Sequence, residues 1–464
     1  MKDFLKSFIA FGLATTLEKL IAFLLVPLYV NIFSVENFGT FDIIQVTIGI
    51  LTIFGIFQLD SALQRYYFDY KGVDKIKFIT MIYVIVILFS FIVVTIILLV
   101  SPYLSLILFK TEIYSKLISI AILQIPLNNI IMISLLILRY EHHNIKFTIL
   151  LLFKVLITLC LILFFVLVLK KEIEGIFIAR LIGGLITIGL MLIVIRRKFN
   201  IHFPKHMLIK SVKYSLPLFP ASIGSVLSAN ANRFFISTFL SITAVGIYAF
   251  SLRIASIMQM IYVAFIMAWG PLLFSKIKES NHKQYFAEIL ILIEIPIVLL
   301  VILISLFSKE IVQFLSPDDY NLSIKYVGGL TLYYSLFIFK EVVDIGPKVT
   351  EKTKYISYNF FITLLINFIL LYFLVQRFDI SGVVIAMLIT NSILVLLSWI
   401  ISNKIYYIPH DTLKFILNII PAYIISLCIM YIDIELNIRI FIAFVTTIIY
   451  LILLVRTIKR RKFV

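Results

Sequence analysis

Fourteen long apolar segments follow one another along this chain, and only short polar gaps separate them. Hydrophobic residues make up 62% of the 464 residues, whereas charged residues make up 14%. A water-soluble fold cannot bury that much apolar surface. A segment of about 20 apolar residues crosses the ~30 Å hydrocarbon core of a bilayer as a helix. A helix also satisfies its own backbone hydrogen bonds there. The sequence therefore predicts an all-α polytopic membrane protein with about fourteen transmembrane helices.

The apolar segments set the expected spans. Buried parallel strands can also be continuously apolar, but the length of these segments and the lack of soluble sequence between them favour helices. The first segment contains Glu18 and Lys19 and is too long for a signal peptide, so we expect it to remain in the mature protein. We predict spans at about 8–33, 41–64, 78–100, 115–138, 147–169, 175–195, 214–240, 246–270, 285–307, 326–347, 355–375, 382–402, 415–431 and 440–455.

Lysine and arginine are concentrated in every second gap. Most of the 41 basic residues fall on the side of the N-terminus if the spans alternate in direction. This bias predicts that both termini are cytoplasmic. The gaps on the other side hold only Lys110, Lys116, Lys170, Lys171, Lys309, Lys325, Arg377 and Arg439.

The net charge of +17 also suggests nucleic-acid binding, but we exclude that partner because the basic residues follow the topology. The two cysteines, Cys160 and Cys428, lie inside predicted spans and offer neither a disulfide framework nor a metal site. His142 and His143 lie in a short cytoplasmic loop, and none of the six histidines has a metal-ligand spacing. No phosphate-binding loop or nucleophile motif is present, and the gaps are too short for a catalytic domain. We therefore expect no catalytic residues, no metal and no cofactor.

The chain repeats itself weakly. The segment KSFIAFGLATTLEKLIAFLLVPLYVNIFSVENFGTFDII near the start is similar to KSVKYSLPLFPASIGSVLSANANRFFISTFLSITAVGIYAF about 205 residues later. Both lead through a long helix into a short turn that begins with serine, and both place a glycine two residues before an aromatic residue. Six expected helices separate the copies, which indicates two parallel six-helix lobes. We predict an N-terminal lobe at 1–200, a C-terminal lobe at 201–403, and an additional helix pair with a basic tail at 404–464.

Several of these segments resemble a known family. They are FLLVPLYVNIFSVENFGTFDI, GIFQLDSALQRYYFDY and YSLPLFPASIGSVLSANANRFFISTFLSITAVGIYAFSLRI. The chain resembles the polysaccharide and O-antigen flippases of the multidrug/oligosaccharidyl-lipid/polysaccharide (MOP) exporter superfamily. The hydropathy match covers the whole chain and the residue-level match about a quarter of it.

The resemblance implies two lobes around a central cavity that opens alternately to either side of the bacterial cytoplasmic membrane. The substrate would be a polyprenyl-diphosphate-linked oligosaccharide, and membrane lipids would surround the chain. Peptidoglycan lipid-precursor flippases also have fourteen helices and remain an alternative, as does a cation or drug antiporter. A membrane-embedded glycosyltransferase or polymerase is less well supported, because no large outer loop is present. The resemblance leaves open whether transport is coupled to protons or sodium, and whether the chain assembles with a polysaccharide polymerase.

Charged side chains inside spans are costly, so they tend to face protein or a wet cavity. Arg233 and Arg253 would lie roughly 12 and 10 Å deep on adjacent helices, at 1.5 Å per residue. Because a guanidinium suits a diphosphate, we predict that both line the cavity. The alternative is that each pairs with a carboxylate or extends to the interface.

Polar neighbours of these arginines are further candidates for the substrate site. Asn230 and Asn232 cannot share a helix face, so at least one is expected between helices and either could bind sugar hydroxyls. Gln58 has the same two interpretations. For Arg65, extension to the inner interface is as plausible as phosphate binding.

Carboxylates inside the spans are candidates for ion coupling, because burial brings their protonation toward neutral pH. Glu18 and Asp60 are the two that we select, and a static salt bridge is the alternative for each. Asp60 and Arg65 lie five residues apart, too far around the helix for an ideal pair. Lys340, Glu341 and Asp344 have the spacing of a local ion network.

Overall fold

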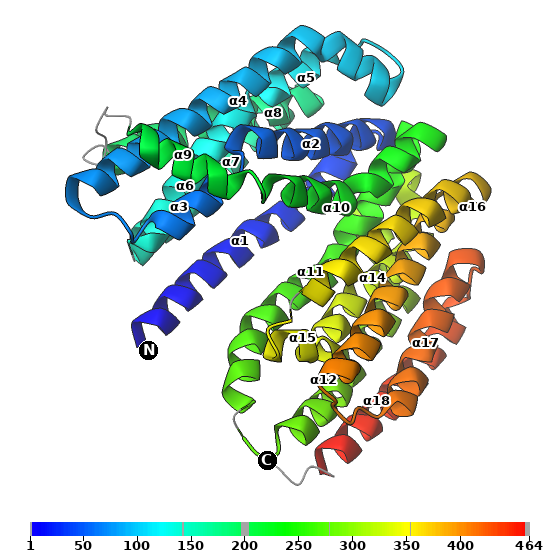
Figure 1. Cartoon of the computed structure of the whole chain (residues 1–464). Coiled ribbons are helices and arrows are strands. Elements are labelled where there is room, and N and C mark those ends of the chain that lie inside the picture. Colours follow the sequence, from blue (N-terminus) through cyan, green and yellow to red (C-terminus); the bar gives the residue numbers. More distant parts are fainter. Residues whose placement is uncertain (1, 142, 196–203, 278, 353, 460–464) are drawn as a thin grey trace. The chain divides into compact units, whose positions relative to one another are not determined.

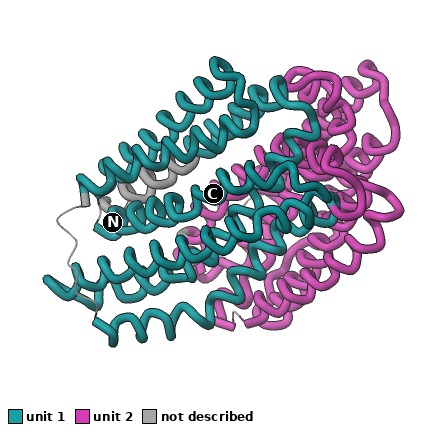
Figure 2. Tube along the Cα trace, turned by 90° about the horizontal axis from the view of Figure 1, so that it is seen from above, with its two compact units in different colours: residues 1–237 teal, residues 238–464 magenta. Residues whose placement is uncertain are grey.

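The computed structural model describes residues 2–141, 143–195, 204–277, 279–352 and 354–459. All regular elements in these ranges are helices. The chain divides into two compact units, Met1–Ser237 and Thr238–Val464, drawn in different colours in Figure 2. The predicted lobe boundary at 200/201 and the basic residues at 196–198 and 460–462 lie outside the described residues, so the three-part division remains a prediction.

Unit 1 is a bundle of membrane-length helices and shorter segments (Figure 1). Its longest element is α4, with 38 residues. The elements of unit 1 are α1 (Lys2–Ile32), α2 (Val35–Ile56), α3 (Leu59–Tyr66), α4 (Gly72–Phe109), α5 (Ser115–Ile122), α6 (Gln124–Tyr140), α7 (Asn144–Leu163), the π-helix η1 (Phe164–Val168), α8 (Glu172–Ile195), α9 (Lys205–Ser215) and α10 (Phe219–Phe239), whose last two residues fall in unit 2.

Unit 2 is built around α14, which packs against α11, α12, α16 and α17. Helices α17 and α18 lie against α12, as Figure 1 shows in orange and red. The elements of unit 2 are α11 (Ile242–Lys276), α12 (His282–Leu306), α13 (Ser308–Leu315), the 3-10 helix η3 (Asp318–Ser323), α14 (Ile324–Val343), α15 (Ile345–Val349), α16 (Lys354–Ile405), α17 (Thr412–Tyr431) and α18 (Leu436–Lys459).

The structure confirms a polytopic all-α membrane protein. Eleven helical segments of the described chain are long and apolar enough to cross a bilayer. The other three predicted spans correspond to α1, to α10, which contains the polar run before Arg233, and to the second half of α16. Large apolar side chains also cover the outside of the helices, as on α4, where Leu99 is 76% exposed. Such a surface is stable in lipid and not in water.

Two serines start corresponding helices in the two repeats. The Ser34 Oγ accepts a hydrogen bond from the Asn37 N–H at 3.2 Å and begins α2. The Ser241 Oγ accepts one from the Ala244 N–H at 3.0 Å and begins α11. Serine is favoured at this position because its oxygen satisfies a free N–H of the first helical turn. The turn that the sequence repeat shares therefore has the same local structure in both copies.

The helix predicted at 41–64 is broken near its C-terminal end. Helix α2 ends at Ile56, and Phe57 and Gln58 both have left-handed backbone conformations with φ of 48° and 55°. Such conformations are unusual for residues other than glycine, so the surrounding contacts must hold them. The Phe57 ring lies 4.4 Å from that of Phe219, and the Ser215 hydroxyl donates a hydrogen bond of 2.8 Å to the Gln58 carbonyl. The α2–α3 break thus lies beside the break between α9 and α10.

Helix α16 is in fact two helices, as the sequence predicts with spans at 355–375 and 382–402. They meet at Asp379, whose φ of 50° and ψ of −135° are not helical. The chain passes very close to itself there. A Cβ atom on Gly382 would lie only 2.0 Å from the Leu374 carbonyl oxygen, so no larger residue fits without a shift of the backbone.

His410 gives unit 2 a pH-dependent contact in the loop before α17. Its ring packs edge-on against Trp399, with ring centroids 5.4 Å apart. Neither ring nitrogen has a hydrogen-bond partner among the described residues. Burial lowers the pKa of His410 from 6.5 to about 4. The folded state therefore holds the ring neutral at pH values where the unfolded chain binds a proton.

We expect stability to fall between pH 6.5 and pH 4 because of this histidine. The contribution of His410 to the free energy of unfolding is complete above pH 6.5 and is lost as the pH drops toward 4. In this range the unfolded chain binds a proton that the folded protein does not bind. Thermal unfolding in detergent at pH 7.5 and pH 5 measures the effect. His410→Phe should reduce the difference in melting temperature between the two pH values, whereas replacement of the exposed His143 should not. An unchanged difference in His410→Phe would show that other groups cause the loss.

Candidate functional site

A buried ion pair lies inside unit 1, between α2 and α10. The Arg233 Nε donates a hydrogen bond to the Asp42 Oδ2, and the two residues are only 9% and 2% exposed. The same guanidinium donates through Nη1 to the Asn230 Oδ1 at 3.2 Å. Asn230 in turn donates to the carbonyl of Val226, one turn earlier, at 2.8 Å. The structure thus places a guanidinium in the membrane-spanning part of the chain, oriented by a carboxylate and an amide.

The sequence predicts Arg233 and Asn230 as site residues, and the structure brings them together. It also shows that Arg233 pairs with a carboxylate, the alternative that the sequence left open. Asn232 is buried, at 5% exposed, on the same helix. The partner Asp42 was not predicted. It falls at the edge of the span predicted at 41–64, where a carboxylate is expected at the interface, but α2 begins at Val35 and places Asp42 about two turns inside the helix.

Arg253 lies on α11, in unit 2, where it is half-buried. Its carbonyl oxygen accepts a hydrogen bond of 2.6 Å from the Ser256 hydroxyl. Arg233 and Arg253 lie in different units, and their predicted proximity stays a prediction.

Gln58 lies at the break that follows α2, and Asp60 and Arg65 lie on α3. The Gln58 side chain accepts a hydrogen bond of 3.0 Å from the Ser61 hydroxyl, which helps to hold the break. The Asp60 Oδ1 is buried and has no hydrogen-bond partner among the described residues. Arg65 pairs with Asp69 at 3.4 Å, in line with the prediction that Asp60 is poorly placed for it. Because the Arg65 side chain is 54% exposed, it lies at the surface end of this segment.

Glu18 has a basic partner on another helix. Its Oε1 lies 3.1 Å from the Lys154 Nζ, which joins α1 to α7. The side chains are 38% and 30% exposed, so the pair is partly accessible. This geometry supplies the salt bridge that the sequence left open as the alternative to ion coupling.

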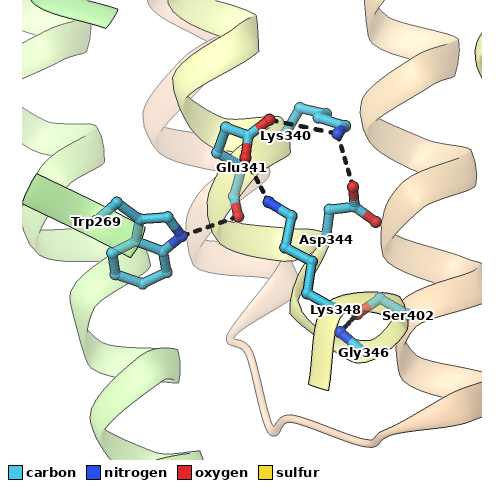
Figure 3. Close-up of polar contacts among 7 residues, drawn as sticks. All are labelled: Trp269, Lys340, Glu341, Asp344, Gly346, Lys348 and Ser402. Atoms are coloured by element: carbon cyan, nitrogen blue, oxygen red, sulfur yellow. Dashed lines mark hydrogen bonds and ion pairs between the residues drawn. The ribbon is translucent and has the colours of Figure 1, made fainter. Parts of the chain in front are cut away.

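Unit 2 contains a compact ion network at the break between α14 and α15 (Figure 3). The Lys340 Nζ lies 2.6 Å from Asp344 and 3.4 Å from Glu341. Glu341 also pairs with Lys348 of α15 through its other oxygen. The Asp344 side chain is only 1% exposed. The network that the sequence predicts from Lys340, Glu341 and Asp344 is therefore present, and Lys348 completes it to two cations and two anions.

Neighbouring helices hold this network in place. The Trp269 Nε1 of α11 donates a hydrogen bond of 3.2 Å to the Glu341 carbonyl. The Gly346 N–H donates one of 2.8 Å to the Ser402 hydroxyl of α16. The break between α14 and α15 is thus fastened to α11 on one side and to α16 on the other. A neutral, internally paired network of this kind can position a helix end.

The fold and these intramembrane charges define a multi-pass helical membrane protein of the transporter class, and comparisons with known proteins agree. Residues 4–278 match the family described as "Polysaccharide biosynthesis protein". The match covers more than half of the chain, which therefore belongs to this family. No curated protein matches the chain by sequence.

Solved structures of the MOP superfamily share the fold. The lipid II flippase MurJ in an inward closed conformation superposes with a TM-score of 0.77 at 20% identity, covering 97% of this chain and 100% of that chain. A mutant of the Vibrio cholerae MATE transporter VcmN gives a TM-score of 0.58 at 15% identity, covering 86% and 96%. An inward-facing multidrug resistance MATE family transporter gives 0.59 at 15%, covering 84% and 94%. The polytopic transporter fold that the sequence resemblance implies is thereby confirmed.

Proposed function

We propose that this chain is a flippase that moves a polyprenyl-diphosphate-linked oligosaccharide across the bacterial cytoplasmic membrane by alternating access. The product would serve surface polysaccharide synthesis, in keeping with the family to which the chain belongs. No bond is made or broken in this process, so we propose no enzymatic activity. The observation that carries the proposal is the buried, oriented guanidinium of Arg233 within a transporter fold.

The chemistry of the headgroup favours this guanidinium. A diphosphate must lose water to cross the membrane, and paired N–H donors replace that water best. Arg233 is already desolvated, and Asp42 and Asn230 fix its orientation. We propose that Arg253, Asn232, Gln58 and Arg65 contribute further contacts along the path of the substrate. Proton or sodium coupling through Glu18 or Asp60, and contact with a polysaccharide polymerase, remain parts of the same hypothesis.

Transport of peptidoglycan lipid precursors is the second candidate function. It is favoured by the high TM-score and nearly complete coverage of the match to the lipid II flippase MurJ. Cation or drug antiport has less structural support, since the MATE structures cover less of this chain at lower TM-scores.

A flipping assay with purified protein tests the proposal. Vesicles that contain the full chain receive fluorescent polyprenyl-diphosphate lipids with different glycans, and an impermeant reductant bleaches only the outer leaflet. If the chain is a flippase, the reductant should bleach nearly all the probe, whereas in protein-free vesicles it should bleach about half. Bleaching of the peptidoglycan precursor alone would assign the second candidate function. If no lipid probe were bleached beyond the level of protein-free vesicles, and an organic cation were transported, the function would be antiport.

The proposed topology gives a separate prediction. We expect fourteen spans with both termini in the cytoplasm, because the basic residues concentrate in alternate gaps. An alkaline phosphatase reporter, which is active only outside the cytoplasm, should be inactive after Val464 and active in the turn at 33–34. A green fluorescent protein fusion at the same two sites should give the opposite pattern. Phosphatase activity at Val464 would show an odd number of spans.

A further inference from the structure

Unit 2 has a cleft where α12 and α17 end and where α14 and α18 begin. Its volume is about 430 Å³, which is within the usual range for ligand pockets. The proposed topology places it at the outer side of the membrane. None of its residues belongs to the charged sites above or to the segment matched by the family. Its lining consists of Leu306, Ser308, Lys309, Gln313, Asn321, Ile324, Lys325, Ile429, Tyr431, Ile432, Asp433, Ile434 and Arg439.

Arg439 forms the rigid wall of this cleft and is only 6% exposed. Two parallel hydrogen bonds of 2.7 and 2.8 Å join its Nη1 and Nη2 to the Glu310 carboxylate. Nη1 also donates to the Leu306 carbonyl at 2.8 Å. Burial acts to raise the pKa of Glu310, but the hydrogen bonds from Arg439 and from the backbone, together with the charges of Arg439 and Lys309, outweigh it, so this pKa lies below its usual value. Glu310 therefore stays ionised and holds the guanidinium plane in place.

One donor of this guanidinium remains unused. The Arg439 Nε is buried and has no hydrogen-bond partner in the part of the chain that the structure describes. A buried donor without a partner costs free energy, so such groups need an explanation. Because this atom is covered by protein, Arg439 contributes positive charge to the wall of the cleft, and the cations that a ligand can contact directly are Lys309 and Lys325.

The mouth of the cleft adds two flexible cations. Lys309 lies 3.7 Å from Asp433, and their side chains are 39% and 82% exposed, so the pair is open to solvent and weak. Lys325, at the start of α14, is exposed and also lines the cleft. Glu310 balances the charge of Arg439, so the two lysines remain against the single lining carboxylate of Asp433. The Asn321 amide at the edge donates to Asp318 at 3.1 Å and leaves its buried Oδ1 without a hydrogen-bond partner among the described residues. The excess of positive charge indicates an anionic ligand.

The other half of the cleft is apolar. Five branched aliphatic side chains contribute to the lining. One of them, Ile432, is 58% exposed, and the neighbouring Tyr431 of α17, which also lines the cleft, is 59% exposed. The cleft therefore combines a fixed guanidinium and two flexible amines with an apolar surface. This combination matches an amphiphile with a phosphate headgroup. The five aliphatic residues are Leu306, Ile324, Ile429, Ile432 and Ile434.

We propose that this cleft binds an anionic phospholipid, with its phosphate on the amines of Lys309 and Lys325 beside the fixed guanidinium of Arg439, and the start of an acyl chain on the isoleucines. The inference does not depend on the identity of the transported substrate. It assigns the helix pair α17 and α18 a role in fixing the chain within an anionic leaflet.

Native mass spectrometry of the full chain in detergent tests this site. The probes are phosphatidylglycerol and phosphatidylethanolamine with identical acyl chains. We expect the double change Lys309→Gln and Lys325→Gln to weaken phosphatidylglycerol binding at least tenfold and to leave phosphatidylethanolamine binding unchanged. Both lysines are exposed, so folding should be unaffected.

Lys116→Gln is the matched control, because Lys116 also lies 3.7 Å from an acidic partner, Glu174, and its side chain is 80% exposed. Phosphatidylglycerol binding should persist in this variant. Equal binding by the wild type and the double variant would refute the proposal. An equal loss in Lys116→Gln would show unspecific attraction instead. Complete displacement of the lipid by millimolar inorganic phosphate would show a free anion site with no role for the acyl chain.

Discussion

Arg233→Ala is expected to reduce the amount of folded protein in the membrane severely, because it leaves the Asp42 carboxylate buried without its partner. Loss of one member of a buried pair typically costs about 3–5 kcal/mol. The measurement is the yield of monodisperse protein after detergent extraction, together with its melting temperature. Arg65→Ala is the control, since the pair of Arg65 with Asp69 is exposed and should contribute at most about 1 kcal/mol.

A neutral pair separates the structural role of Arg233 from its role in transport. Asp42→Asn combined with Arg233→Gln removes both charges and keeps groups that can hydrogen-bond, so we expect folded protein to return. Transport should still fall at least tenfold, because a charge-assisted contact contributes about 1.5–3 kcal/mol and 1.4 kcal/mol is a factor of ten. Normal flipping by the folded double variant would show that the ion pair serves the fold alone.

The ion network of unit 2 should respond just as strongly to the loss of Asp344. Asp344→Asn leaves two lysines to share Glu341, and Lys340 keeps only its longer contact of 3.4 Å. We expect a destabilisation of about 3–5 kcal/mol, measured as a fall in melting temperature. Adding Lys340→Met, which restores the balance of charge, should recover most of it, as a double-mutant cycle would reveal.

Lys276→Met provides the comparison for this cycle. Lys276 pairs with Glu279 at 2.9 Å, but at the exposed end of α11, where its loss should have little effect. Equal stability of Asp344→Asn and the wild type would mean that Asp344 is already neutral in the folded protein.

The sequence predicts the helices of this protein well, because a bilayer requires long apolar segments and such segments are easily recognised in a sequence. It does not predict the break at Phe57 and Gln58. The nearby Gly55 is still helical, and neither left-handed position is a glycine. These conformations are held by Phe219 and Ser215, which lie more than 150 residues further along the chain. Breaks of this kind depend on packing between distant segments.

The ion-pair partners of Arg233 and Glu18 could not be predicted from the sequence either. Arg233, Glu18 and Lys340 were selected because a charge inside a span is costly, which is a local property of the sequence. Asp42 and Lys154 lie on other helices, 191 and 136 residues away from their partners. Only the Lys340 network was predicted with its contacts, because Asp344 lies four residues along the same chain segment.

The two tryptophans of the chain both lie in unit 2, and each one is attached to a feature described above. Trp269 is bonded to the carbonyl of Glu341, and Trp399 packs against His410. Selectively excited tryptophan fluorescence of the unlabelled protein therefore comes from unit 2 alone. Trp399→Phe would leave a single tryptophan beside the break between α14 and α15, and Trp269→Phe a single tryptophan at the loop before α17. Each variant would turn one local rearrangement into an optical signal without a foreign label.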